Sequence, residues 1–348
     1  MKVALDAMGG DYAPAVTVEG AIEAVNESRE LFVILVGNET ELVNELRDKD
    51  YPASSIIIKH ASQIVDMGES PVMALRRKKD SSIKIAVELV KSGEADAMVS
   101  AGNSGVVMAT ALFVLGKLHG VERPAIAAVM PTLKGLFVLI DAGANVDCKA
   151  THLLQFAIMG RAYAKNIFNI EDPKVGLLGI GEEDAKGNEL TREAFKLLSE
   201  IRCGGKDSDI NFIGNIEGKD IFTGDADVVV CDGFVGNIAL KISEGLAEAI
   251  VKMLKREISD KAPGRIGFLF FKDALKGFKK KTDYSEYGGA PLLGISKPCI
   301  ISHGRSTSKA IKNAIKLAGE IHKKGVLDII SQEFIVRTPE RDSVAVKK

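Results

Sequence analysis

Residues 97–115, AMVSAGNSGVVMATALFVL, join a strand, a turn and a helix in one short run. Ala97–Ser100 is an apolar run typical of a buried strand, Ala101–Gly105 is a glycine-rich turn, and Val106–Leu115 is apolar enough for a packed helix. A helix that begins at such a turn directs its unpaired N–H groups towards the loop. This arrangement can bind a phosphate through amides and the helix dipole, and Ser104 would either contact the anion or cap the helix.

The same alternation of strand and helix patterns extends over nearly the whole chain. Helical spacing of apolar residues separates the strand candidates, as in Ser81–Lys91, Thr151–Lys165 and Asn237–Ile258. Short apolar or β-branched runs predict strands at Val3–Asp6, Leu31–Val36, Ile56–Lys59, Ala95–Ser100, Ala125–Met130, Leu136–Ile140, Val175–Ile180, Ile210–Ile213, Asp227–Cys231 and Cys299–Ser302. The alternation predicts an α/β fold, a mostly parallel sheet flanked by helices, with a hairpin at Pro131–Gly135.

We expect one domain over residues 1–336, divided into two lobes around a cleft. Glu171-Asp172-Pro173 precedes a second series of strands and helices, and a chain of 348 residues is long enough for two lobes. The predicted lobes are 1–145 and 146–295, with 296–330 as a candidate return to the first lobe. Residues 337–348 form a polar tail.

Composition and charge narrow the class of protein. The net charge of −1 gives no sign of nucleic-acid binding. The four cysteines are scattered, with no CxxC pair and no histidine at metal-ligand spacing, which indicates a reducing compartment and no metal site. The apolar run after Met1 is too short for a signal peptide, and no stretch is long enough to span a bilayer. We therefore expect a cytoplasmic protein without a metal or cofactor.

Five Gly-Asn dipeptides each follow a strand candidate. With 34 glycines and 12 asparagines, composition predicts about one such pair. Glycine permits close approach of the backbone to a ligand, and asparagine offers both a donor and an acceptor. Each pair alone is best explained as a turn, but five together at strand ends indicate a polar rim for an anion. The pairs are Gly37-Asn38, Gly102-Asn103, Gly187-Asn188, Gly214-Asn215 and Gly236-Asn237.

Three further strand ends carry polar side chains suited to catalysis. Residues 178–188, LGIGEEDAKGN, begin a GxGxxG pattern but have Asp184 in place of the third glycine, and their acidic residues would repel a pyrophosphate. Lys186 in this loop can neutralise phosphate or polarise a carbonyl, or it can be a solvated partner of the neighbouring glutamates. Asp232 follows a buried strand as a cap or an orienting group, and His303 is a candidate acid, base or packing residue.

The patterns of covalent catalysis are missing from the sequence. It contains no GxSxG elbow, no HExxH helix and no Walker GxxxxGK[ST] loop. If the protein is an enzyme, we expect it to align two substrates without an intermediate on serine or cysteine. The glycine-proline stretch Tyr284–Gly294 lacks helical spacing, and we expect it to be a functional loop.

Residues 260–282 form a peripheral amphipathic segment with the composition of a surface anchor. Within it, residues 265–281 hold four of the 14 phenylalanines and six basic residues against one acidic residue. Aromatic and basic residues at helical spacing suit a membrane interface or an acidic partner protein, and a helix packed in the core or in a dimer interface is the alternative. The candidate contact residues are Phe268, Phe270, Phe271, Phe278, Lys279, Lys280 and Lys281.

Several long motifs match a known family in order, from Lys2 to about Ala318. They are LDAMGGD (5–11), ALRRKKDSS (74–82), VSAGN (99–103), RPA (123–125), DAGAN (141–145), GEE (181–183), KGN (186–188), FIGN (212–215), CDGFVGN (231–237) and EYGGAPLLG (286–294). On these motifs the chain closely resembles the bacterial phosphate acyltransferases, the PlsX family of phospholipid synthesis. It departs from the family pattern at Ser104, where threonine is usual, at Gly179, where asparagine is commoner, and at Arg305, where serine is usual.

This resemblance implies a fold, a reaction and a set of site residues. The fold would be the Rossmann-like αβα sandwich shared with phosphotransacetylase and isopropylmalate dehydrogenase. Inorganic phosphate would attack the thioester of a fatty acyl group on acyl carrier protein and give acyl phosphate. The expected phosphate-binding residues are Gly102, Asn103, Ser104 and Gly105. The expected catalytic residues are Lys186, Asn188, Asp232 and His303. The expected supporting polar residues are Asp6, Asn215 and Asn237.

The resemblance also implies partners and a location. The partners would be acyl carrier protein, inorganic phosphate, a second copy of the chain in a homodimer, and a membrane glycerol-phosphate acyltransferase that receives the product. Peripheral attachment of a cytoplasmic protein to the membrane surface would suit the segment 260–282. Two alternatives stay open. One is a phosphotransacetylase-like enzyme that uses acyl-CoA, and the other is a non-catalytic scaffold that binds acyl carrier or lipid.

Overall fold

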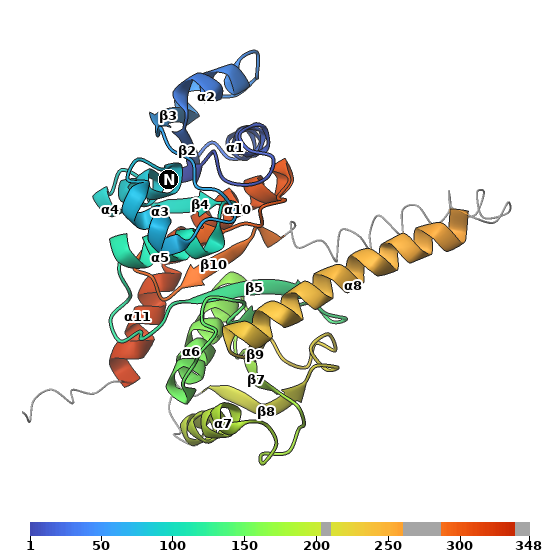
Figure 1. Cartoon of the computed structure of the whole chain (residues 1–348). Coiled ribbons are helices and arrows are strands. Elements are labelled where there is room, and N and C mark those ends of the chain that lie inside the picture. Colours follow the sequence, from blue (N-terminus) through green and yellow to red (C-terminus); the bar gives the residue numbers. More distant parts are fainter. Residues whose placement is uncertain (203–209, 260–286, 338–348) are drawn as a thin grey trace, which may run out of the picture.

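The computed structural model describes residues 1–202, 210–259 and 287–337, and it unites eleven strands in one sheet (Figure 1). Their order across the sheet is β3-β2-β1-β4-β11-β10-β5-β6-β9-β7-β8. In chain order the strands are β1 (Lys2–Asp6), β2 (Phe32–Gly37), β3 (Ile56–His60), β4 (Ala97–Ser100), β5 (Ala125–Pro131), β6 (Leu136–Ile140), β7 (Lys174–Gly179), β8 (Asn211–Glu217), β9 (Val228–Val230), β10 (Ala290–Leu293) and β11 (Cys299–Ile301).

Two parallel halves of this sheet meet at an antiparallel centre. Strands β3, β2, β1, β4 and β11 form one parallel half, and β6, β9, β7 and β8 form the other. Between the halves, β10 runs antiparallel to both β11 and β5, and β5 runs antiparallel to β6. The β5–β6 hairpin closes where the Thr132 N–H donates to the Gly135 carbonyl at 2.8 Å. The predicted mostly parallel sheet and the predicted hairpin are confirmed.

Strand β10 lies near the centre of the sheet, although the sequence predicts a loop there. The prediction of a loop is wrong for Ala290–Leu293, and Tyr284–Glu286 lie outside the described residues. Proline is rare in central strands because it cannot donate a ladder hydrogen bond. Pro291 is tolerated because β10 is short and has only two register pairs with each neighbour. The ten other strands coincide with the ten predicted ones to within a few residues.

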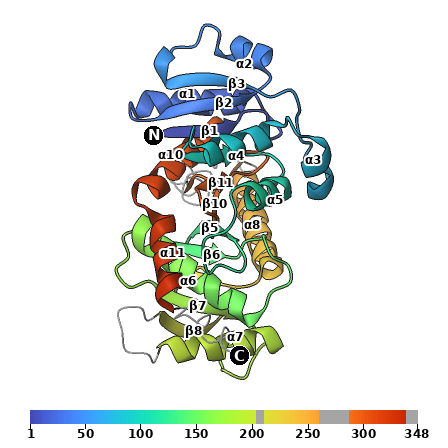
Figure 2. The same cartoon turned by 90° about the vertical axis from the view of Figure 1, so that its left-hand side faces the viewer.

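Helices cover both faces of the sheet, which makes the predicted αβα sandwich (Figure 2). On one face, α1, α10, α11, α6 and α7 share one continuous hydrophobic cluster. On the other face, α4 and α5 cover one cluster and α8 covers a second. The helices are α1 (Ala15–Glu27), α2 (Glu39–Leu46), α3 (Pro71–Arg77), α4 (Ser82–Ser92), α5 (Ser104–Val114), α6 (Ala150–Ile167), α7 (Glu189–Arg202), α8 (Gly233–Ser259), α10 (Ser308–Lys323) and α11 (Val326–Arg337), with a short 3-10 turn, η1 (Ala53–Ser55).

Successive side chains of a strand lie on opposite faces of the sheet. This alternation determines which polar groups lie on the face covered by α4, α5 and α8. In β1, Val3 and Leu5 belong to the continuous cluster, whereas Ala4 belongs to the cluster under α4 and α5. Successive side chains in a strand point to opposite faces, so Asp6 shares the face of Ala4. By the same rule Ser100, at the end of β4, shares the face of Met98. Two polar groups therefore lie at the carboxyl edge beside the start of α5.

The chain returns to the first half of the sheet near its end. β11 pairs with β4, and α10 packs against α1. The lobe boundaries at 145 and 295 stay a prediction.

Among the described residues, no helix has the length and apolar content needed to cross a bilayer. The amphipathic segment 260–282 and residues 338–348 of the predicted tail lie outside the described residues, whereas Arg337 ends α11.

Candidate functional site

A cavity of 310 Å³ lies where the helix layer is interrupted between α5 and α8. We call it the central cavity. Its walls are mostly hydrocarbon, from Ile126 and Ala128 of β5, Leu240 of α8, Ala290 of β10 and Ile301 of β11. Its polar lining comes from the ends of three chain segments and from one helix face: Asp11, Gly102, Ser104, Asn237, Lys241, Glu244, Ser302, His303 and Gly304. The lining of the cavity thus combines apolar and polar side chains.

Residues 102–105, which we call the cavity loop, lead from β4 into α5. Asn103 is the N-cap of the helix: its Oδ1 accepts from the Val106 N–H at 3.1 Å. Its Nδ2 donates to the carbonyls of Met67 and Glu69 at 2.8 and 3.0 Å, which ties the loop to a neighbouring segment. Because the first N–H groups of a helix have no acceptor within it, Ser104 and Gly105 present amides at the positive end of α5. Of the four predicted phosphate-binding residues, Gly102 and Ser104 line the central cavity.

The buried carboxyl group of Asp6 supports the cavity loop through hydrogen bonds. Asp6 is fully buried and accepts from the Ser100 hydroxyl at 2.6 Å, and the same hydroxyl accepts from the Gly102 N–H at 3.0 Å. Burial raises the pKa of Asp6, although hydrogen bonds from Ser100, Ser82 and two backbone amides oppose that shift. A side chain at Gly9 would overlap the Asp6 carboxylate and would lie 2.7 Å from the Gly102 nitrogen. Asp6, a predicted supporting residue, therefore fixes the loop through Ser100, which the sequence reasoning missed.

The segment 302–306 brings a second set of polar groups to the same cavity. Ser302 is buried, and its hydroxyl has no hydrogen-bond partner among the described residues. Buried hydroxyls are nearly always partnered, so this one is available to a water or to a ligand in the cavity. The Nδ1 of His303 accepts from the Arg305 N–H at 3.1 Å. His303 was predicted, whereas Ser302 was missed because it ends an apolar strand pattern.

Helix α8 supplies the opposite wall of the cavity. Asn237, Lys241 and Glu244 stand three or four residues apart and share one helix face. Burial raises the pKa of Glu244, against the opposing effect of the His303 and Lys241 charges. Asn237 was predicted as a support. Lys241 and Glu244 were not, because their spacing in the sequence is that of any amphipathic helix.

The remaining predicted polar residues lie at the carboxyl edge of the other half of the sheet. Asp232 caps α8 by accepting from the Val235 N–H at 2.9 Å, and Asn188 accepts from the Thr191 N–H at 2.9 Å at the start of α7. Asn215 donates to the Glu183 carbonyl at 3.1 Å, which holds the loop that carries the exposed Lys186. Within the part of the chain that the structure describes, none of these four residues lines the central cavity. Their catalytic and supporting roles stay predictions.

A second buried aspartate organises that edge. Asp141 follows β6 and accepts from the backbone N–H groups of Ile126, Gly143, Ala144 and Asn145 and from the Asn145 amide, at 2.7–3.1 Å. Burial raises the pKa of Asp141, and the five donors stabilise its ionised form. Its carboxylate has no capacity left for a substrate, so it serves as a structural hub. The described residues contain no group of three or more His, Cys, Asp and Glu suited to a metal ion.

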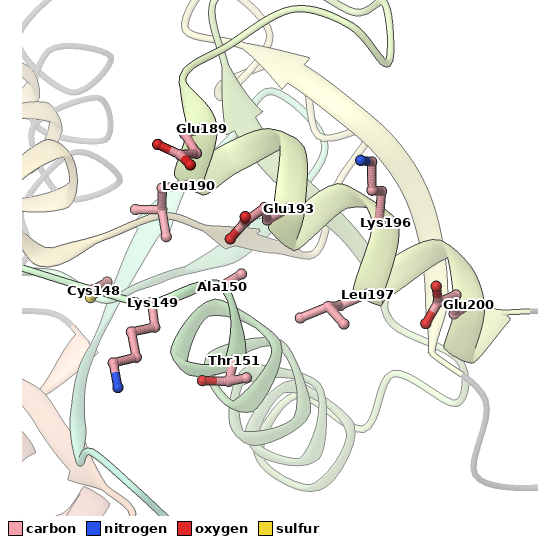
Figure 3. A pocket seen from close by; sticks show the side chains of 10 residues that line it. All are labelled: Cys148, Lys149, Ala150, Thr151, Glu189, Leu190, Glu193, Lys196, Leu197 and Glu200. Carbon is pink, nitrogen blue, oxygen red and sulfur yellow. The ribbon is translucent and has the colours of Figure 1, made fainter.

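The groove between the start of α6 and α7 is larger, at 730 Å³, but its chemistry is different (Figure 3). Glu189, Glu193 and Glu200 of α7 line it beside Lys149 and Lys196. Three carboxylates against two cations give this groove an excess of one negative charge, as Asp11 and Glu244 against Lys241 give the central cavity. Burial raises the pKa of the Cys148 thiol in this groove to about 12, so the thiol is not a nucleophile at neutral pH. The central cavity is the better candidate site.

The Gly-Asn pairs have mixed roles. Asn38, Asn103 and Asn188 are helix N-caps, each accepting from the N–H three residues further on. Asn215 supports a loop, and Asn237 lines the central cavity. Capping at strand-to-helix junctions accounts for three of the five pairs, because asparagine is among the preferred N-cap residues. Helix capping thus explains most of the excess of Gly-Asn pairs over the number expected from composition.

Comparison with known proteins gives concordant results. A family described as "Fatty acid synthesis protein" matches residues 1–329. The phosphate acyltransferase of Thermodesulfovibrio yellowstonii is 58% identical over 98% of this chain and 96% of its own length. That of Geobacter sulfurreducens is 54% identical over 96% of this chain and 94% of its own.

Among solved structures, a phosphotransacetylase from Streptococcus pyogenes covers 94% of each chain with a TM-score of 0.61 at 22% identity. The EutD phosphotransacetylase from Staphylococcus aureus has a TM-score of 0.59 at 18% identity, over 92% of this chain and 94% of its own. At these identities the likeness concerns the fold alone. It agrees with the predicted phosphotransacetylase-like architecture.

Proposed function

This chain belongs to the phosphate acyltransferase family of fatty acid synthesis proteins and is an acyltransferase, and we propose that its acyl donor is acyl-[acyl carrier protein]. Inorganic phosphate would be the acceptor, and acyl phosphate for phospholipid synthesis would be the product. The observation that carries this proposal is the central cavity, whose lining includes the start of α5, Lys241 and the Ser302 hydroxyl, which has no hydrogen-bond partner among the described residues. Helix N-termini and cations bind phosphate, and apolar walls suit a fatty acyl group.

In the proposed mechanism, a phosphate oxygen attacks the carbonyl carbon of the thioester. The new C–O bond forms, the carbonyl becomes an oxyanion, and the C–S bond then breaks with its electron pair on sulfur. The amides of Ser104 and Gly105 and the Lys241 ammonium would hold the phosphate, and the Ser302 hydroxyl would donate to one of the reacting oxygens. His303 would hydrogen-bond to the departing sulfur, which would take its proton from the attacking hydrogen phosphate, so that acyl phosphate and a free thiol result.

The direct test is acyl-phosphate formation by the purified full-length chain. We expect product from palmitoyl-[acyl carrier protein] only when phosphate is present, and a much lower kcat/KM with palmitoyl-CoA. Equal or greater efficiency with the CoA thioester would make the protein a phosphotransacetylase-like enzyme instead. Binding of acyl carrier protein without phosphate-dependent loss of thioester would identify a scaffold.

Two lysines compete for the role of the phosphate cation. Lys241 lines the central cavity, whereas Lys186, predicted from its glycine-rich loop, lies exposed at the other half of the sheet. Truncation of the cation that holds phosphate should raise the KM for phosphate and lower kcat/KM about 100-fold. A folded Lys186→Ala variant with full turnover would remove Lys186 from the mechanism, and the same result for Lys241→Ala would remove Lys241.

We propose a homodimer in which α8 packs against a second copy of the chain. Val235, Ile238, Ile242, Leu246 and Ile250 are 37–63% exposed and follow helical spacing along α8. Figure 1 shows this helix extending away from the sheet. A long exposed apolar stripe on a helix is typical of an interface. Leu246→Glu should convert the dimer to a monomer in sedimentation experiments, and an unchanged mass would contradict the interface.

Membrane attachment is proposed from sequence alone, for the segment 260–282 with its phenylalanines and lysines. A chain that delivers acyl phosphate to a membrane glycerol-phosphate acyltransferase would benefit from docking on the bilayer. Binding to anionic vesicles should fall when Phe268–Phe278 are deleted and should weaken with added salt. Undiminished binding of the deletion variant would refute the anchor. Loss of carrier-protein binding alone would assign the segment to that partner instead.

A further inference from the structure

Helix α3 and the residues just before it lie against the cavity loop. The Asn103 Nδ2 donates to the carbonyls of Met67 and Glu69 in this segment, at 2.8 and 3.0 Å. Met67 also lines the central cavity, and a Cβ at Gly105 would lie only 3.1 Å from the Pro71 Cγ at the start of α3. Figure 2 shows α3 beside α5, at the margin of the molecule. The helix is therefore fixed next to the central cavity.

The outer side of α3 carries two apolar residues followed by two arginines. Val72 and Met73 are 57% and 37% exposed, and Arg76 and Arg77 are exposed four residues further on. Residues four apart lie on the same side of a helix, so each apolar side chain has an arginine as its neighbour. Ala74, between the two pairs, is buried. We call the four exposed residues the α3 face.

The arginines of the α3 face belong to a run of four successive cations, which differ in how they are used. Lys78 is held within the molecule, because its ammonium contacts the Glu69 carboxylate at 2.6 Å. Cations in the last turn also stabilise the dipole of their own helix, but that effect does not explain the exposed apolar pair beside them. Three members of the run form no ion pair with any residue that the structure describes: Arg76, Arg77 and Lys79.

Exposed cations next to apolar side chains suit an acidic protein partner. Arginine and methionine are enriched at protein interfaces, and complementary charges steer two proteins together. An anionic bilayer fits less well, because helices that bind in the membrane interface carry Trp, Phe or Leu on their apolar side. The α3 face has none of these three residue types. The donor of the proposed reaction is itself a protein, and its thioester must reach the central cavity.

We propose that the α3 face docks the acyl carrier protein. An acidic surface of the carrier would contact Arg76 and Arg77, and apolar side chains of the carrier would pack against Val72 and Met73. The inference rests on the proposed function, because it takes a thioester on a carrier protein as the donor. Docking here would hold the donor beside the cavity loop and the start of α5, and the attraction of opposite charges would speed association.

The test is steady-state kinetics of the full-length Arg76→Glu/Arg77→Glu variant with palmitoyl-[acyl carrier protein]. At low salt the KM for this donor should rise about 10-fold, with kcat and the KM for phosphate unchanged, and the difference should shrink as salt is added. Palmitoyl-pantetheine, which has no carrier protein, should react equally with the variant and the unmodified enzyme.

Arg29→Glu/Lys91→Glu is the matched control, with the same change of charge. Both residues are exposed and precede strands, Arg29 before β2 and Lys91 before β4, so they lie towards the amino edge of the sheet, away from the cavity loop. This variant should keep the KM of the unmodified enzyme. Val72→Ser/Met73→Ser tests the apolar half of the face independently, and its rise in KM should persist at high salt.

An unchanged KM for palmitoyl-[acyl carrier protein] in both α3 variants would overturn the docking surface. An equal loss with palmitoyl-pantetheine would also overturn it, since the effect would then lie in the reaction itself. A lower mass in sedimentation would assign the α3 face to a second copy of the chain, and weaker binding to anionic vesicles with an unchanged KM would assign it to a membrane.

Failure of the proposed function would give a different result, namely no acyl phosphate from the unmodified enzyme with either donor. The docking surface is then judged by calorimetric binding of the carrier protein, which needs no turnover. Arg76→Glu/Arg77→Glu should weaken that binding about 10-fold, whereas Arg29→Glu/Lys91→Glu should not. Equal binding by the two variants would contradict the proposal.

Discussion

The cavity loop and the loop at 181–188 share a sequence pattern, but they lie in different surroundings. Each follows a buried strand, contains or ends in a Gly-Asn pair and leads into a helix capped by that asparagine. The cavity loop rests on the buried Asp6–Ser100 pair and faces α8 across the central cavity. The loop at 181–188 is mostly exposed. The comparison teaches that a strand-to-helix motif fixes where a helix begins, whereas the elements packed opposite decide whether ligands can be held there.

The largest effect should come from one added methyl group under the cavity loop. Gly9→Ala forces a Cβ against the Asp6 carboxylate and the Gly102 nitrogen, so the loop must move. We expect kcat/KM to fall about 100-fold, since displacements of this size misalign reacting groups. The measurement is steady-state acyl-phosphate formation, with circular dichroism to verify folding.

Gly181→Ala is the matched control in the other loop. Its Cβ would lie 2.9 Å from the Glu183 carboxylate and 2.9 Å from the Lys186 Cγ, and both side chains are exposed and can turn away. Activity should stay within roughly twofold of the unmodified enzyme. Equal losses in the two variants would mean that both loops contribute to the site.

The second prediction concerns the ionisation of Asp6, the buried carboxyl group that supports the cavity loop. Because burial raises the pKa of Asp6 above its ordinary 3.8, the folded state holds this proton more tightly than the unfolded state. The free energy of unfolding should therefore fall as pH rises from about 3.8 through the folded pKa. In Asp6→Asn this fall should be smaller, although Asp141 contributes with the same sign in both proteins. Urea unfolding between about pH 4 and pH 7 measures the difference, and parallel curves would contradict it.

The smallest effects should come from the capping asparagines. Asn38→Ala and Asn188→Ala each remove one cap and should cost about 1 kcal/mol in unfolding free energy. Asn103→Ala also releases the carbonyls of Met67 and Glu69 and should cost about 2 kcal/mol. Asn38 has no proposed catalytic role and serves as the control. A loss of turnover in Asn188→Ala that Asn38→Ala does not share would support the catalytic role predicted for Asn188.

Much of the architecture could be predicted because its signals are local. Apolar runs of strand length and helical spacing identified ten of the eleven strands, and the turn residues at Pro131–Gly135 identified the hairpin. Strand β10 was not predicted, because Pro291 and the neighbouring glycines are typical of loops. Its pairing also depends on residues more than 160 positions earlier in β5. Gly102, Ser104, Asn237 and His303 were predicted from their positions at strand ends, and all four line the central cavity.

The sequence by itself determined the α/β class, the family and the strand ends that carry polar side chains, since each of these depends on neighbouring residues or on contiguous motifs. Only the tertiary structure decided which strand ends face one another across a cavity. The order of the strands brings the ends of β4 and β11 together opposite α8, and it leaves the loop after β7 three strands beyond the antiparallel centre. Ser302, Lys241 and Glu244 became site residues for that reason. No local pattern marks a side chain whose importance comes from a partner distant in the sequence.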